Sequence, residues 1–119
     1  MTVTFYWYPK CSTCCKAKKW LEDRNITINE IHIVDENPSK EALENLYKTS
    51  GLELKKFFNT SGMKYRELGL KVKVATASEE ELLEILASDG MLVKRPIVTD
   101  GQSVTLGFNE KQFEEVWGK

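Results

Sequence analysis

The segment TVTFYWYPKCSTCCKAKKWL, residues 2–21, decides the fold of this chain. Residues 2–8 are β-branched and aromatic with no breaker, which predicts a buried strand that ends at Pro9. From Ser12 to Asp23 apolar residues recur at helical spacing with lysines between them, which predicts an amphipathic helix. A C-x-x-C motif therefore lies at a junction between a strand and a helix, and we place the candidate reactive site there.

Three further segments follow the same logic. Residues 26–33 alternate apolar and polar positions, so we expect a second strand whose isoleucines (Ile26, Ile28, Ile31 and Ile33) face the core. Ser39 precedes an apolar stripe that stops at Gly51, which predicts an N-cap and a C-terminal stop of one helix. Ser78 with Glu81 forms a capping box for another helix.

Shorter elements complete the pattern. Residues 52–62 predict a helical turn and a loop, and residues 61–71 predict a short helix closed by Gly69. Asp100-Gly101 separates two short β-type runs, 95–99 and 103–108, which indicates a hairpin. A final helix is expected after the N-cap Asn109.

The order of these elements indicates the fold class. A β-α-β unit is right-handed and parallel, and it is followed by a mostly helical stretch and then by β-β-α. We therefore predict an α/β thioredoxin-like fold with a mixed four-stranded sheet in a single domain, residues 1–119, with a helical insertion at about 38–90. Pro96 opens a strand, and in thioredoxin-like folds such a proline is cis and lies against the active-site cysteine.

Composition excludes several classes of protein. Hydrophobic residues make up 41% and charged residues 29% of the chain, which is typical of a globular domain. The net charge of −1 gives no global indication of nucleic-acid binding. No apolar run approaches the ~18 residues that cross a bilayer, and the first residues do not resemble a signal peptide. We therefore expect a cytoplasmic protein. The reducing cytosol and the odd number of cysteines, 3, both argue against structural disulfides.

The position of Cys11 predicts its chemistry. A cysteine that follows a strand and begins a helix is exposed to unpaired backbone amides and to the positive end of the helix dipole, which lower the pKa of a thiol. Lys10 adds positive charge beside it. Cys14 returns to the same helix end after one turn and can attack a mixed disulfide formed at Cys11. The spacing thus favours a redox function.

Other interpretations remain open at some residues. Zinc binding needs further ligands, and only His32 remains, so we expect no metal site. We expect His32 to be an ordinary half-exposed strand residue. Ser12 or Thr13 is the expected N-cap of the first helix. Cys15 either packs inward as a small apolar residue, which we favour, or lies beside Cys11.

The chain resembles the arsenate reductase/Spx family of thioredoxin-fold proteins from end to end. The resemblance rests on YWYPKCSTC (6–14), SGLELKKFFNTSGMKYRELGL (50–70), LASDGMLVKRPIVTDG (86–101) and VTLGFNEKQFEEVW (104–117). It is closer to the branch of glutaredoxin-coupled arsenate reductases than to Spx. In that branch the cysteine attacks arsenate, and arginines bind the oxyanion.

This resemblance implies roles for particular residues. Cys11 would be the nucleophile and Cys14 the resolving thiol. The implied substrate- or anion-binding residues are Arg95, Pro96, Ser12, Thr13 and Asn59. Three arginine positions of the family are occupied here by Asn59, Phe108 and Cys15, so we expect weak arsenate reduction or none.

The sequence therefore predicts a cytosolic thiol-disulfide redox enzyme that needs no metal or organic cofactor. Its reductant would be glutathione with glutaredoxin, or thioredoxin, and its partner a small thiol or a protein disulfide, with an oxyanion as a further option. We expect a monomer without direct contacts to nucleic acid or membrane. The alternative, also implied by the resemblance, is a Spx-like redox-sensing regulator that binds the C-terminal domain of the RNA polymerase α subunit.

Overall fold

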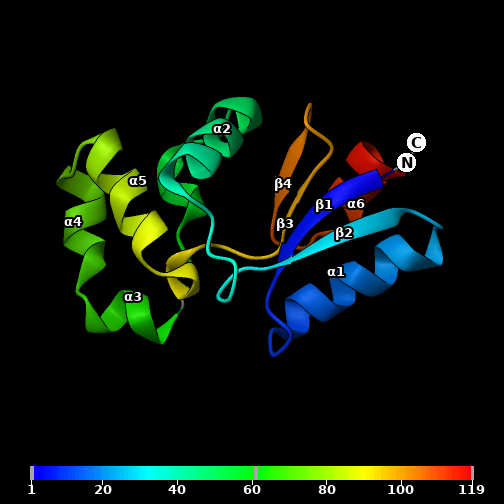
Figure 1. The fold of residues 1–119 in the computed structure, drawn as a ribbon, viewed down its shortest axis with the longest axis horizontal. Coiled ribbons are helices and arrows are strands. Elements are labelled where there is room, and N and C mark those ends of the chain that lie inside the picture. The colour runs from blue at the N-terminus through cyan, green and yellow to red at the C-terminus, as the bar shows by residue number, and fades with distance from the viewer. Residues whose placement is uncertain (1, 61, 119) are drawn as a thin grey trace. The chain divides into compact units, whose positions relative to one another are not determined.

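The computed structural model describes residues 2–60 and 62–118. The chain divides into two compact units. The first combines the chain up to His32 with the chain from Arg95 onward, at the blue and red ends of the colour scale in Figure 1. The second unit is the segment Ile33–Lys94 between them. The N-terminal and C-terminal parts of the sequence thus build one structure together.

The first unit contains a mixed four-stranded sheet with the order β2-β1-β3-β4. Its strands are β1 (Thr2–Trp7), β2 (Thr27–His32), β3 (Ile97–Thr99) and β4 (Val104–Leu106). Strand β1 pairs in parallel with β2, and β3 pairs antiparallel with both β1 and β4. The sheet and its helices confirm the predicted α/β thioredoxin-like fold, including the hairpin at Asp100-Gly101.

Two helices share one hydrophobic core with this sheet. These are α1 (Ser12–Asp23) and α6 (Glu110–Trp117), and Asn109 caps α6 as predicted. Their buried side chains pack with those of the strands: Val3, Phe5, Ala17, Trp20, Leu21, Ile26, Val98, Phe113 and Trp117. The indole N–H of Trp117 donates to the buried hydroxyl of Thr105 at 3.1 Å, so the polar group in this core is satisfied. This packing holds α1 against the sheet.

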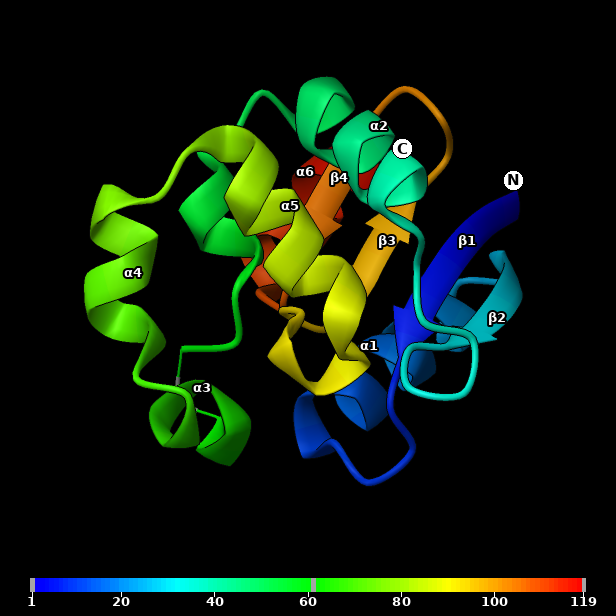
Figure 2. The same ribbon diagram turned by 60° about the vertical axis from the view of Figure 1, so that its left-hand side comes forward.

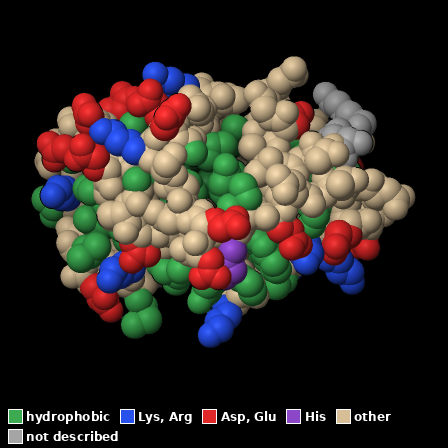
Figure 3. All heavy atoms as spheres, in the orientation of Figure 1, with side chains coloured by type: hydrophobic (Ala, Val, Ile, Leu, Met, Phe, Trp, Pro, Cys, Tyr) green, Lys and Arg blue, Asp and Glu red, His purple; other side chains and the backbone are tan. Residues whose placement is uncertain are grey.

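The second unit is helical, and its described residues form α2 (Lys40–Ser50), η1 (Leu54–Phe57), α3 (Met63–Glu67), α4 (Leu70–Thr76), α5 (Glu79–Ser88) and η2 (Gly90–Leu92). Helices α2 and α5 lie side by side (Figure 2). Lys40 of α2 forms ion pairs with Glu80 and Glu84 of α5, at 2.7 and 3.2 Å. Figure 3 shows basic side chains among acidic ones over this part of the surface. No helix among the described residues is long and apolar enough to span a membrane.

Two details differ from the sequence prediction. The short helix predicted at 61–71 is α3, and Gly69 is the N-cap of a further helix, α4, at residues 70–76. No element was predicted for residues 72–76, because lysines and valines alternate there like the residues of a strand. Of the four isoleucines expected in the core, Ile26 and Ile33 are buried, whereas Ile28 and Ile31 are only half-buried. Strand β2 lies at the edge of the sheet, so its faces are less covered than those of β1.

Candidate active site: a thiol pair at the start of α1

Cys11 is itself the N-cap of α1. Its backbone is extended, with φ −92° and ψ 114°, and its sulfur accepts the backbone N–H of Cys14 at 3.4 Å. The N–H of Cys11 donates to the carbonyl of Tyr8 at 3.0 Å, which fixes the turn that leads from β1. The prediction that Ser12 or Thr13 caps the helix is wrong, because both residues already lie within α1 and are exposed. A sulfur atom therefore occupies the place where a capping oxygen usually lies.

The surroundings of Cys11 favour its thiolate. Burial raises the pKa of the Cys11 thiol, but hydrogen bonds from the Cys14 thiol and backbone N–H, and the Arg95 guanidinium, lower it. The pKa of Cys11 ends below its ordinary value of 9.0. The first turn of α1 holds no acidic residue that would compete for the positive helix end. Cys11 is partly exposed, so a reagent can reach it.

Cys14 has the opposite character. Its side chain is 0% exposed, and the pKa of its thiol is raised to about 12. Burial is the largest cause, and the hydrogen bond to Cys11 and the negative charge of Cys11 act in the same direction, while a backbone hydrogen bond with Tyr8 and the charge of Arg95 partly oppose them. Near neutral pH the protonated thiol of Cys14 is thus a donor to the sulfur of Cys11. The two environments therefore make Cys11 the candidate nucleophile and keep Cys14 as a buried, protonated thiol.

Cys15 is exposed, and its sulfur donates weakly to the carbonyl of Pro9 at 3.5 Å. The expectation that Cys15 packs inward is wrong. Cys14, Ala17 and Leu21 form the buried stripe of α1, at spacings of three and four residues. Cys15 lies ~100° away around the helix, on its solvent side.

Arg95 and Pro96 complete the site from a distant part of the sequence. The peptide bond between them is cis, as predicted. The carbonyl of Pro96 accepts the N–H of Gly107 at 2.8 Å, which ties this segment to the residue after β4. The positive charge of Arg95 lowers the pKa of the Cys11 thiol. The fold therefore brings Arg95 to the thiol pair.

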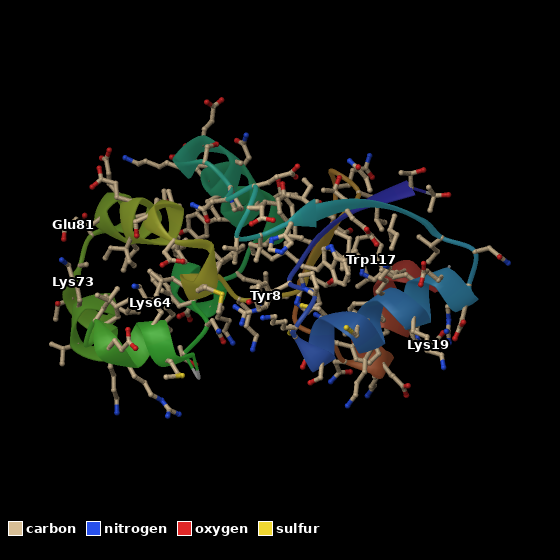
Figure 4. All side chains as sticks on the ribbon, turned by 60° about the horizontal axis from the view of Figure 1, so that its bottom comes forward. Tyr8, Lys19, Lys64, Lys73, Glu81 and Trp117 are labelled. Carbon is tan, nitrogen blue, oxygen red and sulfur yellow. The ribbon has the colours of Figure 1, made fainter. Side chains whose placement is uncertain are left out.

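Two aromatic side chains at the site were not predicted to belong to it. The guanidinium carbon of Arg95 lies 5.2 Å from the ring centroid of Tyr8. The ring of His32 meets that of Tyr8 at a centroid distance of 5.6 Å and an angle of 86°. Figure 4 shows Tyr8 where the chain leaves β1 for α1. An aromatic residue directly before the turn at Pro9 was the sequence feature that could have identified Tyr8. His32 is half-buried, as expected.

Asn59 and Phe108, which stand at two arginine positions of the resembled family, provide no positive charge. Asn59 belongs to the second unit, where its N–H donates to Leu92 at 2.8 Å and its carbonyl accepts from Gly62 at 3.1 Å. Its role in anion binding stays a prediction. Phe108 is an apolar packing residue, with its ring 4.9 Å from that of Phe113. Within residues 2–60 and 62–118, no cluster of His, Cys, Asp and Glu side chains is arranged to hold a metal ion.

Comparison with known proteins gives consistent matches over nearly the whole chain. The pattern of the ArsC family matches residues 6–116. The uncharacterized protein YusI of Bacillus subtilis (strain 168) is 68% identical over 98% of this chain and 99% of its own length. The regulatory protein MgsR of the same organism is 32% identical over 90% of this chain and 83% of its length. The crystal structure of an ArsC family related protein from Bacteroides fragilis is 49% identical, covers 97% of both chains and has a TM-score of 0.92.

Proposed function

Because this chain belongs to the ArsC family, we propose that it is a thiol-disulfide oxidoreductase that works through Cys11 and Cys14. One observation carries the proposal: a partly exposed thiol with a lowered pKa caps α1, and a buried thiol with a raised pKa donates to it. In such a pair, the thiol with the lowered pKa attacks a disulfide, and the second thiol resolves the mixed disulfide that forms.

The first step is attack by the Cys11 thiolate on a disulfide of the partner. A bond forms between the Cys11 sulfur and one partner sulfur, the partner disulfide breaks, and the other partner sulfur leaves as a thiolate. Arg95, whose charge lowers the pKa of Cys11, supplies positive charge near the sulfurs among which negative charge is shared. Cys14 cannot begin the exchange because its sulfur is fully buried.

The second step is attack by Cys14 on the Cys11 sulfur of the mixed disulfide. Once Cys11 is in a disulfide, it carries no negative charge, so two of the effects that raise the pKa of Cys14 are lost, and only burial remains. Cys14 gives up its proton, bonds to Cys11 and releases the second partner thiol. Two electrons have then passed to the partner, and the Cys11–Cys14 disulfide is reduced again by two thiols of glutathione, with glutaredoxin, or by thioredoxin.

A trapping experiment tests this order of events. The protein is mixed with hydroxyethyl disulfide, and the products are mapped by mass spectrometry. Cys14→Ser should accumulate a mixed disulfide on Cys11, whereas the wild type should pass on to the Cys11–Cys14 disulfide. Cys15→Ser is the matched control, since it removes an adjacent but exposed thiol, and it should behave as the wild type. Accumulation on Cys15, or an internal disulfide that includes Cys15, would contradict the proposal.

We expect arsenate to be a poor substrate. Arg95 provides a forked donor at Cys11, but Phe108 is apolar and packs against Phe113, and Cys15 adds no positive charge. A trianion needs several fixed positive partners to be held against water. An arsenate reduction assay coupled to glutaredoxin or thioredoxin should show weak turnover or none. Rapid turnover would show that other residues, such as Asn59, bind the anion.

The similarity to MgsR supports a second candidate function. In this alternative, oxidation of Cys11 and Cys14 switches a regulator that binds the C-terminal domain of the RNA polymerase α subunit. A pull-down with that domain, using reduced and oxidised protein, distinguishes the two functions. Binding that depends on the redox state would favour the regulator, and its absence with active thiol exchange would favour the enzyme.

The proposed reductants belong to the cytoplasm, so we place the protein there. The proposed cycle uses protein thiols throughout and requires neither a metal nor an organic cofactor. One chain supplies both cysteines and Arg95, so a monomer is sufficient. The partner is a small disulfide or a protein disulfide, and no step of the cycle calls for nucleic acid or a membrane.

A further inference from the structure

We infer that Tyr8 is a positioning residue whose ring holds the guanidinium of Arg95 beside the sulfur of Cys11. The inference rests on the proposed function, because it concerns the ionisation of the same thiol. The side chain of Tyr8 takes no direct part in the proposed reactions of the two cysteines.

The guanidinium of Arg95 lies over the ring of Tyr8. The guanidinium carbon lies 5.2 Å from the ring centroid, within the range at which an aromatic face attracts a cation. Arginine has a long side chain with several rotatable bonds, so its charge acts at one atom only where a neighbour restricts it. The ring of Tyr8 limits where the charged end of Arg95 lies.

The ring of Tyr8 is itself restricted by His32. His32 ends β2 and is paired in register with Trp7, the last residue of β1. From there the imidazole packs at 86° to the ring of Tyr8, with centroids 5.6 Å apart. Edge-to-face contact of this kind orients an aromatic ring. The parallel pairing of β1 and β2 therefore supports the ring, and the ring supports the guanidinium.

The side chain and the backbone of Tyr8 make different contacts. The carbonyl of Tyr8 accepts the N–H of Cys11 at 3.0 Å, and this hydrogen bond involves backbone atoms only. A substitution of the ring should thus leave the turn before α1 in place and alter only the position of Arg95. This makes the two contributions experimentally separable.

The experiment is a double-mutant cycle on the ionisation of Cys11. Its midpoint is measured from the pH dependence of the rate at which iodoacetamide alkylates Cys11, with the site confirmed by mass mapping. The variants are Tyr8→Leu, Tyr8→Phe, Arg95→Gln, and Tyr8→Leu combined with Arg95→Gln. Circular dichroism and thermal melting show that each variant is folded.

We expect Tyr8→Leu to raise the midpoint of Cys11 ionisation by about half a pH unit. Tyr8→Phe keeps the aromatic face, so its midpoint should equal that of the wild type. Arg95→Gln should raise the midpoint at least as much, and Tyr8→Leu should then add nothing. An equal shift from Tyr8→Leu with and without Arg95 would overturn the inference, because Tyr8 would then act independently of Arg95. No shift from Arg95→Gln would instead contradict the part assigned to Arg95 in the proposed function.

Discussion

The N-termini of α1 and α6 lie in the same unit and are capped in the same way, but with different atoms. In α6, the side-chain oxygen of Asn109 accepts the N–H of Gln112 at 3.1 Å. In α1, the sulfur of Cys11 accepts the N–H of Cys14 at 3.4 Å. An amide oxygen stays neutral, whereas a thiol can lose its proton and become a charged acceptor. The capping geometry is thus ordinary, and only the capping atom makes one helix start reactive.

The first turns of the two helices differ as well. Glu110 lies in the first turn of α6, and glutamates occupy the same region of α2 and α5. The first turn of α1 contains no acidic residue. Acidic side chains near a helix N-terminus interact favourably with its positive end. In α1 the positive helix end interacts with the thiolate of Cys11 instead. The first turn of α1 therefore lacks stabilising acidic side chains, and the same positive end favours the reactive form of the thiol.

The largest expected effect comes from making α1 resemble α6 at its cap. Cys11→Ser keeps an acceptor for the N–H of Cys14 but removes the nucleophile. We expect thiol exchange with hydroxyethyl disulfide to fall by at least about 100-fold, since the remaining thiols are buried or lack this placement. The free energy of unfolding at pH 7 should change by less than about 1 kcal/mol. Both are measured on the same preparations, by exchange kinetics and by urea denaturation.

The matched control removes the other cap. Asn109→Ala should lower the free energy of unfolding by about 1 kcal/mol, because the N–H of Gln112 loses its acceptor. It should leave the rate of thiol exchange unchanged. If Asn109→Ala slowed exchange as much as Cys11→Ser, the contrast between a structural cap and a reactive cap would be wrong.

A smaller effect should follow from adding the charge that α1 lacks. Thr13 is exposed in the first turn of α1. Thr13→Glu should raise the pKa of Cys11 by about half a unit, because a carboxylate there opposes the thiolate. Alkylation rates measured against pH give the shift, and Thr13→Gln is the neutral control. A shift of the same size in Thr13→Gln would show that the charge is not responsible.

The smallest expected effect is a dependence of stability on pH. The pKa of folded Cys11 lies below its ordinary value of 9.0, so the stabilisation that it contributes is present above pH 9 and is lost as the pH falls through the folded pKa. Between pH 6 and pH 9 the wild type should therefore gain stability relative to Cys11→Ser. Urea denaturation of both proteins across this window measures the difference, and a falling difference would contradict the lowered pKa.

The upper limit of that window follows from Cys14. Its folded pKa is raised to about 12, so its stabilising contribution is present below the unfolded pKa near 9 and is lost as the pH rises toward 12. Above pH 9 the contribution of Cys11 is constant, and the falling contribution of Cys14 takes over. Below pH 9 the trend belongs to Cys11.

Much of the fold was predictable because local rules determine it. Ser39, Ser78 and Asn109 each cap a helix as expected, since each precedes an apolar stripe at helical spacing. The predicted bounds of α1 were also correct. Helix α4 was missed because its alternating lysines and valines have the period of a strand, and the helical setting of the second unit overrides that local preference.

The candidate site was predictable only in part. The positions of Cys11 and Cys14 followed from the motif, and the burial of Cys14 could have been found from its spacing to Ala17 and Leu21. The capping role of Cys11 could not be found in this way, because it depends on where the turn after β1 ends. The environment of Cys15 was predicted wrongly, since the phase of the helix was not applied to it.

The sequence by itself determined the thiol pair, the strand and helix that hold it, and a proline able to adopt the cis form, because each depends on neighbours along the chain. Only the tertiary structure decided which charge acts on the pair. Arg95 lies more than eighty residues after Cys11, and sheet pairing between β1 and β3 brings it to the sulfur. Tyr8 and His32 join the site for the same reason, since β1 and β2 end side by side. Ionisation depends on distances in space, and these exist only once the strands have paired.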